Sequence, residues 1–366
     1  MKPADVLVTA IATGSVALYH VAKRFLDPYV SRKPFARWFF FSPFLGASTS
    51  SSSGGGGGGV AAWRVVNFAS YLLNVAAVSV PGRIDDQMAK EMKEAKENND
   101  KEVNYGGGDG INTIRRTSRY RSLFTPAGYA FAIWGFIFAS ELVFSARSMF
   151  LRNTRDETFA ANATGFFALA NVLQCVWCFT FREWTEKPKR HWINAFVLGT
   201  EALALWSSKE RVFEVNGMFA SESAFVSIPI RTHFAWILCA CGINANTVVA
   251  KVGSASAQVV AAIGTAVLAT AVGAYSSYYR GDAATPLVFA WALYAIHKDG
   301  GHRKAPPSNA NTSADAKEDK KVDASAAKTK TTEIPSEKQT KQFIDIARAC
   351  AFANLFFALS AFFVVL

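Results

Sequence analysis

The sequence has few charged residues and few cysteines for its length. Only 18% of its 366 residues are charged, whereas a soluble domain of average composition has about a quarter. The five cysteines all lie inside apolar stretches, so they do not form the disulfide framework of a small secreted protein; they are Cys175, Cys178, Cys239, Cys241 and Cys350. This composition argues against a soluble globular enzyme.

Catalytic and nucleic-acid-binding motifs are also missing. The sequence contains no Ser/His/Asp constellation and no His-Glu-x-x-His motif, and its glycine-rich stretch 106–110 lacks the Gly-Lys-Ser/Thr ending of a phosphate-binding loop. The net charge is +11, but the basic residues flank apolar segments and follow no zinc-finger, RNA-binding or helix-turn-helix pattern. We therefore expect a protein that is not an enzyme and binds no nucleic acid.

Long apolar blocks dominate what is present. They run for about 18–24 residues, the length that crosses a bilayer as a helix. The first block, 6–21, is short, and is either a retained span or a targeting segment. The sequence predicts an all-α, polytopic membrane helical bundle whose candidate spans are 6–21, 63–80, 127–149, 159–181, 192–207, 228–249, 259–279, 286–297 and 343–366.

One stretch resembles a known family. Residues 123–138 read LFTPAGYAFAIWGFIF and are similar to the entry into the second helix of the TspO/MBR family (translocator protein, tryptophan-rich sensory protein), in a longer branch with extra C-terminal helices. Residues 173–177, Glu201 with Trp206, and Trp236 with Asn244 follow in the order of the family's third, fourth and fifth helices. The resemblance covers about 67–297, and Gln174 stands where the family usually has Asn.

The resemblance implies a five-helix core followed by about three extra C-terminal spans. We divide the chain into an N-terminal membrane anchor or signal-anchor at 1–25 and a flexible Ser/Gly-rich linker at 26–62. The core takes 63–250 with a polar insert at 81–123, and additional membrane helices take 251–297. A disordered Lys/Ala/Ser-rich loop at 298–341 then leads to a C-terminal membrane helix at 342–366.

Buried charges mark the candidate site. Glu141 and Glu201 lie inside apolar blocks, where a charged side chain is costly and tends to face the bundle interior. His233 shares a helix face with Trp236, whereas Arg231 faces about 200° away from it, so Arg231 and His233 cannot both point at one site. The imidazole is either a structural group, an axial ligand for a haem-type iron, or a hydrogen-bond donor to a ligand.

The family implies binding of a flat, mostly apolar ligand of tetrapyrrole or sterol type, with a sensing or transport role. The expected ligand-binding residues are Tyr129, Trp134, Gln174, Trp177, Glu201, Trp206, His233, Trp236 and Asn244. No metal site is expected; a porphyrin or haem-type ligand is the one cofactor that the family suggests. The expected partners are membrane lipid, the hydrophobic ligand, and either a second copy of the chain or a membrane complex.

Two other functions remain open. The first is a transporter for a small metabolite or ion, with Glu141, Glu201 and Arg231 along its path. The second is a structural subunit of a membrane complex that docks through the insert 81–123. For any of the three functions we expect a eukaryotic organelle or endomembrane, with the basic loops on the cytosolic-equivalent side.

Overall fold

The computed structural model describes residues 62–81, 83, 122–152, 155–186, 190, 192–216, 224–299 and 335–365. This part of the chain contains eight α-helices, two short 3-10 helices and no strand. The α-helices are α4 (Ala62–Val78), α7 (Ile133–Ser148), α8 (Arg155–Thr180), α9 (Trp192–Asn216), α10 (Ala224–Val252), α11 (Ala255–Arg280), α12 (Ala284–Asp299) and α13 (Glu337–Val365). The 3-10 helix η2 (Gly128–Ala132) leads into α7, and η3 (Glu183–Glu186) follows α8.

The all-α prediction is therefore confirmed. Each of the expected segments from 63 onward coincides with one helix. The expected anchor 1–25, nearly all of the linker 26–62, and most of the insert 81–123 and the loop 298–341 lie outside the described residues. Several boundaries differ. Among them, α9 continues past 207 to Asn216, and α13 begins at Glu337, inside the stretch expected to be a loop.

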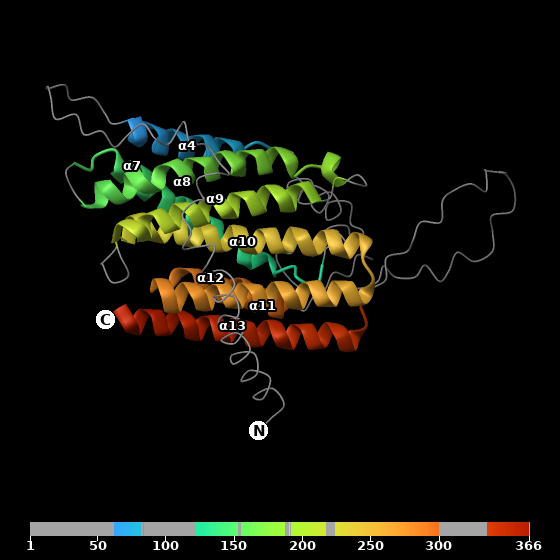
Figure 1. Ribbon diagram of the computed structural model, residues 1–366. Coiled ribbons are helices and arrows are strands. Elements are labelled where there is room, and N and C mark those ends of the chain that lie inside the picture. Colours follow the sequence, from blue (N-terminus) through green and yellow to red (C-terminus); the bar gives the residue numbers. More distant parts are fainter. Residues whose placement is uncertain are drawn as a thin grey trace, which may run out of the picture.

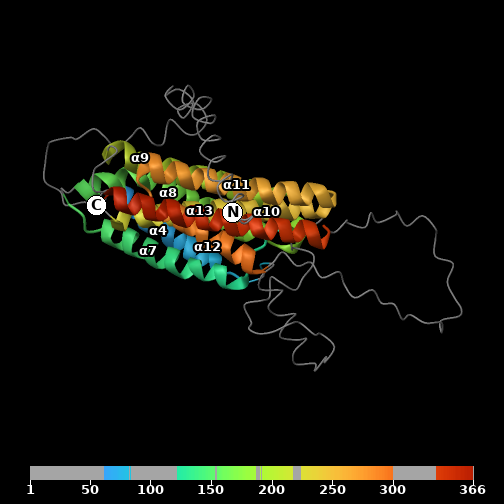
Figure 2. The same ribbon diagram turned by 90° about the horizontal axis from the view of Figure 1, so that it is seen from below.

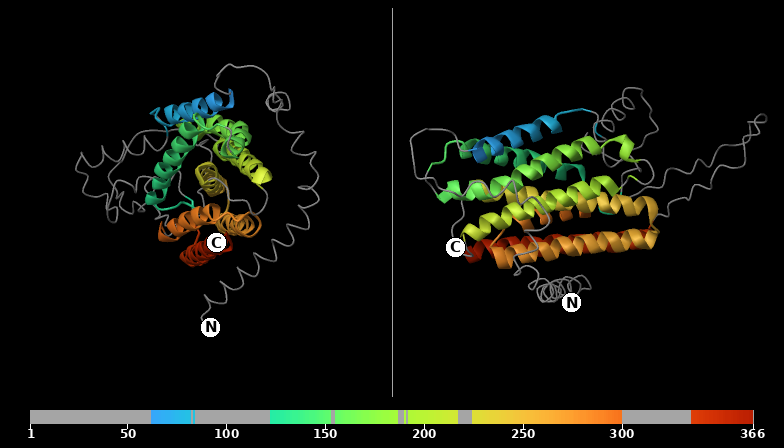
Figure 3. Two further views of the ribbon diagram at one scale, coloured as in Figure 1. Left: turned by 90° about the vertical axis from the view of Figure 1, so that its left-hand side faces the viewer. Right: turned by 45° about the horizontal axis from the view of Figure 1, so that its top comes forward.

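The helices lie side by side in one bundle (Figure 1). Helices α4, α7, α8 and α9 form one side of it, and α11, α12 and α13 form the other (Figures 1 and 2). Viewed along its axis, the bundle has α10 at its centre (Figure 3, left). Because α10 contacts α7, α8, α9, α11 and α12, its side chains meet both sides of the bundle.

Within the described residues, five helical segments are long and apolar enough to cross a membrane, and the protein is an integral membrane protein. They are Gly128–Ser148, Asp156–Thr180, Ala224–Val252, Ala255–Arg280 and Glu337–Ala361. Helices α4 and α12 have 17 and 16 residues, slightly fewer than the roughly 20 that a span usually needs. Helix α9 has 25 residues, but its C-terminal part is rich in charge.

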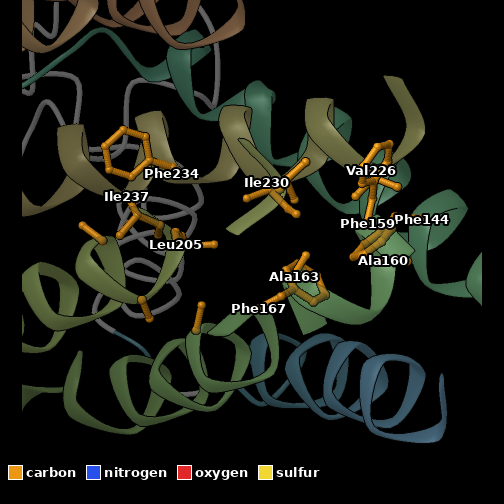
Figure 4. Packing of buried hydrophobic residues seen from close by; sticks show 14 of the residues in the cluster. Phe144, Phe159, Ala160, Ala163, Phe167, Leu205, Val226, Ile230, Phe234 and Ile237 are labelled. Carbon is orange, nitrogen blue, oxygen red and sulfur yellow. The ribbon is translucent and has the colours of Figure 1, made fainter. Parts of the chain in front are cut away.

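The main core fills the space between α7, α8, α9 and α10. Phe144, Phe159 and Phe167 are almost fully buried there, against Leu205 and Ile230 (Figure 4). Ala160 and Ala163 of α8 belong to the same cluster, and small residues let helix backbones approach closely in membrane bundles. This packing fixes the rotation of α8, α9 and α10 and therefore the directions of their polar side chains.

Candidate functional site

Three buried ionisable side chains from three helices meet inside the bundle. The Nδ1 atom of His233 on α10 lies 2.6 Å from Oε1 of Glu141 on α7. On the other side of the ring, Nε2 lies 3.3 Å from Oε1 of Glu201 on α9. All three side chains have zero exposure. We call Glu141, His233 and Glu201 the triad.

Neighbouring side chains complete the surroundings of the triad. The Gln174 amide on α8, with its nitrogen turned toward Glu201, donates to Oε1 over 2.6 Å. The Trp134 ring meets the His233 ring edge-on at a centroid distance of 5.7 Å. Trp134 also meets Trp236 at 6.3 Å, and Trp236 meets Phe131 at 5.5 Å. The triad therefore lies beside an aromatic wall that η2, α7 and α10 build.

Two local features help to position α10 and α7 at the triad: a proline near the start of α10 and a hydrogen-bonded turn before α7. Pro229 lies within the first two turns of α10; since proline has no N–H and its ring clashes with the preceding turn, it weakens the helix there. Before α7, Thr125 Oγ1 accepts from Ser122 N over 2.9 Å and closes a tight turn. The next residues anchor η2 to α12, because Ala127 N donates to the carbonyl of Ala295 over 3.1 Å.

Two polar atoms in and beside the triad are buried but have no hydrogen-bond partner among the described residues. They are Oε2 of Glu141 and Nε1 of Trp236. Nε1 of Trp177, whose ring stacks on Phe181 just after the end of α8, is also buried without a partner. The 3.3 Å contact of His233 Nε2 also falls short of hydrogen-bond geometry. A buried polar group without a partner costs about 1–3 kcal/mol. Several such groups close together therefore indicate a binding site, where the polar atoms of a ligand would supply the missing hydrogen bonds.

The surroundings of His233 do not fit an axial haem ligand. Each ring nitrogen faces a carboxylate, so an iron at either nitrogen would have to displace Glu141 or Glu201. In the described part of the chain, moreover, no group of three His, Cys, Asp or Glu residues is placed to hold a metal ion. The remaining two interpretations, a structural imidazole or a hydrogen-bonding group, both agree with the geometry.

The structure gathers some of the expected site residues and separates others. His233 contacts both Glu141 and Glu201, Gln174 contacts Glu201, and Trp134 contacts His233 and Trp236. Trp177 lies one helical turn beyond Gln174 on α8.

The other three expected site residues have different neighbours. Tyr129 packs edge-on against Trp291 of α12, and Trp206 packs against Phe234 and Tyr275. The amide nitrogen of Asn244 donates to the carbonyl of Ala240 in its own helix.

A second group of buried charges was not predicted. Nζ of Lys209 on α9 lies 2.8 Å from Oδ2 of Asp282 and donates to Oγ of Ser276 over 3.0 Å. Nη1 of Arg231 on α10 lies 3.9 Å from Oδ1 of Asp282. Lys209 also lies over the Trp206 ring. We call Lys209, Asp282 and Arg231 the latch, because they join α9 and α10 to the α11–α12 turn.

The turn that carries Asp282 is defined by its glycine. Gly281 has φ 56°, a left-handed conformation that favours glycine, and the N–H of Asp282 donates back to the Ser276 carbonyl over 3.0 Å. The Asp282 carboxylate accepts from both N and Oγ1 of Thr285 and so caps the start of α12. Burial alone would raise the pKa of Asp282, but the charges of Lys209 and Arg231 outweigh it and hold that pKa well below its usual range.

The latch confirms that Arg231 and His233 point to different sites. It also removes Arg231 from a path shared with Glu141 and Glu201, because Arg231 faces Asp282. The one sequence signal for a buried Lys209 is its position one helical turn after Trp206.

The fold and the site define the class of this protein. It is a helical membrane protein with a buried carboxylate–imidazole–carboxylate group beside an aromatic wall. The family model described as TSPO-like protein matches residues 103–309, which is more than half of the chain, and the chain belongs to this family. The match runs from the insert before η2 to beyond the end of α12; α4 and α13 lie outside it. Proteins of this family are generally non-enzymatic. No curated protein and no solved structure matches the chain.

Proposed function

We propose that this TSPO-like membrane protein binds a flat, mostly apolar ligand of tetrapyrrole or sterol type at the triad and its aromatic wall. The observation that carries the proposal is the pair of buried polar atoms without partners among the described residues, Oε2 of Glu141 and Nε1 of Trp236, beside the Trp134 and Trp236 rings. Apolar walls with a few polar groups of defined position are typical of small-molecule sites. In this proposal the protein senses or carries such a ligand within the membrane.

The proposed site is narrower than the one expected from sequence. It keeps Trp134, Gln174, Trp177, Glu201, His233 and Trp236 and adds Glu141. Tyr129, Trp206 and Asn244 have other neighbours, so we assign them to helix packing. The triad also supplies the buried ionisable groups that a transporter needs, but the path through Arg231 is not retained.

We further propose that all eight described helices cross the membrane. On α4 the buried side chains are mostly polar, among them Asn67 and Asn74, whereas Val65, Leu72 and Leu73 are about half exposed. Asn74 donates to Asn171 of α8 over 2.8 Å, and Ser145 of α7 donates to Asn67 over 2.9 Å. A helix that is polar inside and apolar outside fits lipid better than water. Helices α9 and α12 also expose apolar residues, including Leu203 and Leu287.

The remaining proposals concern where the protein lies and what it meets. An organelle or endomembrane location, basic loops on the cytosolic-equivalent side, and a homodimer or membrane-complex partner stay predictions. Contact with lipid follows from the membrane location.

The test of the proposed function is a titration of the purified full-length protein with protoporphyrin, following tryptophan fluorescence and the porphyrin absorption band. Trp236→Phe keeps an aromatic ring but removes the indole N–H, and should weaken saturable binding at least about threefold to tenfold, the equivalent of one lost hydrogen bond. Trp192→Phe on the exposed face of α9 is the matched control and should bind like the wild type. Absence of saturable binding, or equal loss in both variants, would contradict the proposal.

A further inference from the structure

The turn between α8 and α9 holds two arginines over exposed aromatic rings. The guanidinium carbon of Arg182 lies 6.0 Å from the centroid of the Phe179 ring, and that of Arg190 lies 5.8 Å from the centroid of the Trp184 ring. Both rings are exposed, and Nε1 of Trp184 donates to the carbonyl of Phe179 over 3.3 Å. The two cations therefore belong to one linked group of side chains, Phe179, Arg182, Trp184 and Arg190, which we call the turn cluster.

Hydrogen bonds fix the backbone of this turn. The short helix η3 carries Thr185, a buried residue whose Oγ1 lies 2.9 Å from the carbonyl oxygen of Thr180 and 2.8 Å from that of Arg182. The same oxygen accepts from Nδ2 of Asn194 on α9 over 3.2 Å. These bonds join the end of α8 to the start of α9 around Trp184. Because the turn is ordered before a partner binds, less conformational entropy is lost on binding.

The positive charge of the turn is not neutralised by the side chains that the structure describes. The stretch 182–190 contains four Lys or Arg residues and two Glu residues. Neither Arg182 nor Arg190 has an ion-pair partner among the described side chains. At the other end of α8, by contrast, Glu157 in the first turn pairs with Arg64 of α4. An anion from outside the chain can therefore contact the guanidinium groups of the turn cluster.

The exposed aromatic rings around the turn favour a lipid headgroup as the source of this anion. Two residues after Arg190, Trp192 begins α9 and meets Phe196 edge-on at a centroid distance of 5.8 Å, and both rings are exposed. Aromatic side chains favour the interface between hydrocarbon and headgroups, and the candidate span of α8 ends at Thr180, directly before the turn. A phospholipid can cover these rings with its chains and offer its phosphate to the arginines, whereas a soluble anion can only do the second.

We propose that the α8–α9 turn is a binding site for an anionic phospholipid. Arg182 and Arg190 contact its phosphate, and the rings of Phe179 and Trp184 contact the upper part of its acyl chains. Arginine suits this role because its planar guanidinium can donate two hydrogen bonds to one phosphate and can stack on an aromatic ring at the same time. An anionic headgroup is preferred over a zwitterionic one, whose own cation is repelled by the arginines. This site shares no residue with the triad and does not depend on the proposed function.

The test is native mass spectrometry of the full-length protein in an uncharged detergent, titrated with phosphatidylglycerol and with phosphatidylcholine of the same acyl chains. For the first bound lipid, we expect the dissociation constant of phosphatidylglycerol to be lower by about tenfold or more. Each basic residue at an anionic lipid surface changes binding by roughly fivefold, so Arg182→Gln/Arg190→Gln should reduce the preference to about twofold or less. Arg182→Lys/Arg190→Lys keeps both charges and should keep at least about half of the preference. If the double glutamine variant does not fold, Arg190→Gln, at an exposed side chain, should still show about a fivefold loss.

The matched control is Arg147→Gln. Arg147 is also an exposed arginine over an aromatic ring, with its guanidinium carbon 4.3 Å from the centroid of Phe225, but it lies near the end of α7 that leads into the start of α8. This variant should keep the full preference for phosphatidylglycerol.

Three results would overturn the proposal. The first is equal affinity of the wild type for the two lipids, and the second is a preference that the double glutamine variant keeps or that Arg147→Gln loses equally. The third is binding of inorganic phosphate alone as tight as that of phosphatidylglycerol, which would make the turn a site for a soluble anion. A preference that Arg147→Gln keeps and the double glutamine variant loses would establish the lipid site.

Discussion

The two groups of buried charges differ in how completely their polar atoms are paired. In the latch, the Asp282 carboxylate meets Lys209, Arg231 and both polar atoms of Thr285, and Lys209 also reaches Ser276. In the triad, by contrast, Glu141 keeps an unpaired oxygen and His233 makes one short contact and one loose contact.

This difference separates a structural role from a binding role. A fully paired buried group gains nothing from another molecule, and it joins helices that would otherwise be held only by packing. A partly paired group keeps a donor or acceptor without a partner, so a ligand can form a hydrogen bond with it and remove that cost.

Breaking the latch should cause the largest loss of stability. Lys209→Met leaves Asp282 buried with a weaker partner, and removal of one member of a buried pair costs about 3–5 kcal/mol. Thermal unfolding in detergent should therefore show a lower midpoint. Adding Asp282→Asn should recover part of the loss, because the unpaired charge is then removed. Arg348→Ala, which breaks an exposed pair with Asp345, is the control and should change stability by at most about 1 kcal/mol. A Lys209→Met protein as stable as this control would show that the latch is not structural.

Acid should weaken the latch before it affects other packing. The folded-state pKa of Asp282 is depressed, and each unit of depression corresponds to about 1.4 kcal/mol. Its contribution is therefore fully present above the unfolded-state pKa of about 4 and is lost as the pH falls from there toward the folded pKa. Unfolding midpoints measured between pH 6 and pH 3 should fall more steeply in wild type than in Asp282→Asn. Parallel profiles would contradict the pairing.

Neutralising the triad should have a smaller effect on stability than breaking the latch. Glu141→Gln keeps the shape of the side chain and its contact to His233, but exchanges a charge-assisted hydrogen bond for a neutral one. The expected loss is about 1 kcal/mol, partly offset by relief of the repulsion between Glu141 and Glu201. Chemical or thermal unfolding of the variant beside Lys209→Met measures the contrast directly. If Glu141→Gln proves the more damaging change, the triad is the structural group.

Much of the fold could be predicted from the sequence because the bilayer imposes a length on each apolar block. All eight described helices fall on expected segments, and Glu141, Glu201 and His233 stand out as costly polar groups inside them. Their meeting could not be predicted, since it depends on the rotation of α7, α9 and α10 about their axes, which the core around Phe144 and Phe167 determines.

The latch could not be predicted from the sequence, for a different reason. The apolar block of α9 ends near residue 207, so Lys209 reads as an interfacial residue with its charge in water. Its partner Asp282 comes from a turn more than seventy residues later along the chain, whose direction depends on the left-handed Gly281. Tyr129, Trp206 and Asn244 were expected at the site by family analogy alone, and their neighbours belong to helix packing and to the latch.

The most direct test of the central claim is the thermal shift caused by protoporphyrin in three proteins: wild type, Trp134→Ala and Asp282→Asn. A ligand at one hundred times its dissociation constant stabilises its target by about 2.7 kcal/mol. We predict that Asp282→Asn starts from a lower midpoint but keeps the ligand-induced shift, whereas Trp134→Ala, which loses the ring beside His233, loses the shift. A shift retained in Trp134→Ala and lost in Asp282→Asn would place the ligand at the latch and contradict binding at the triad.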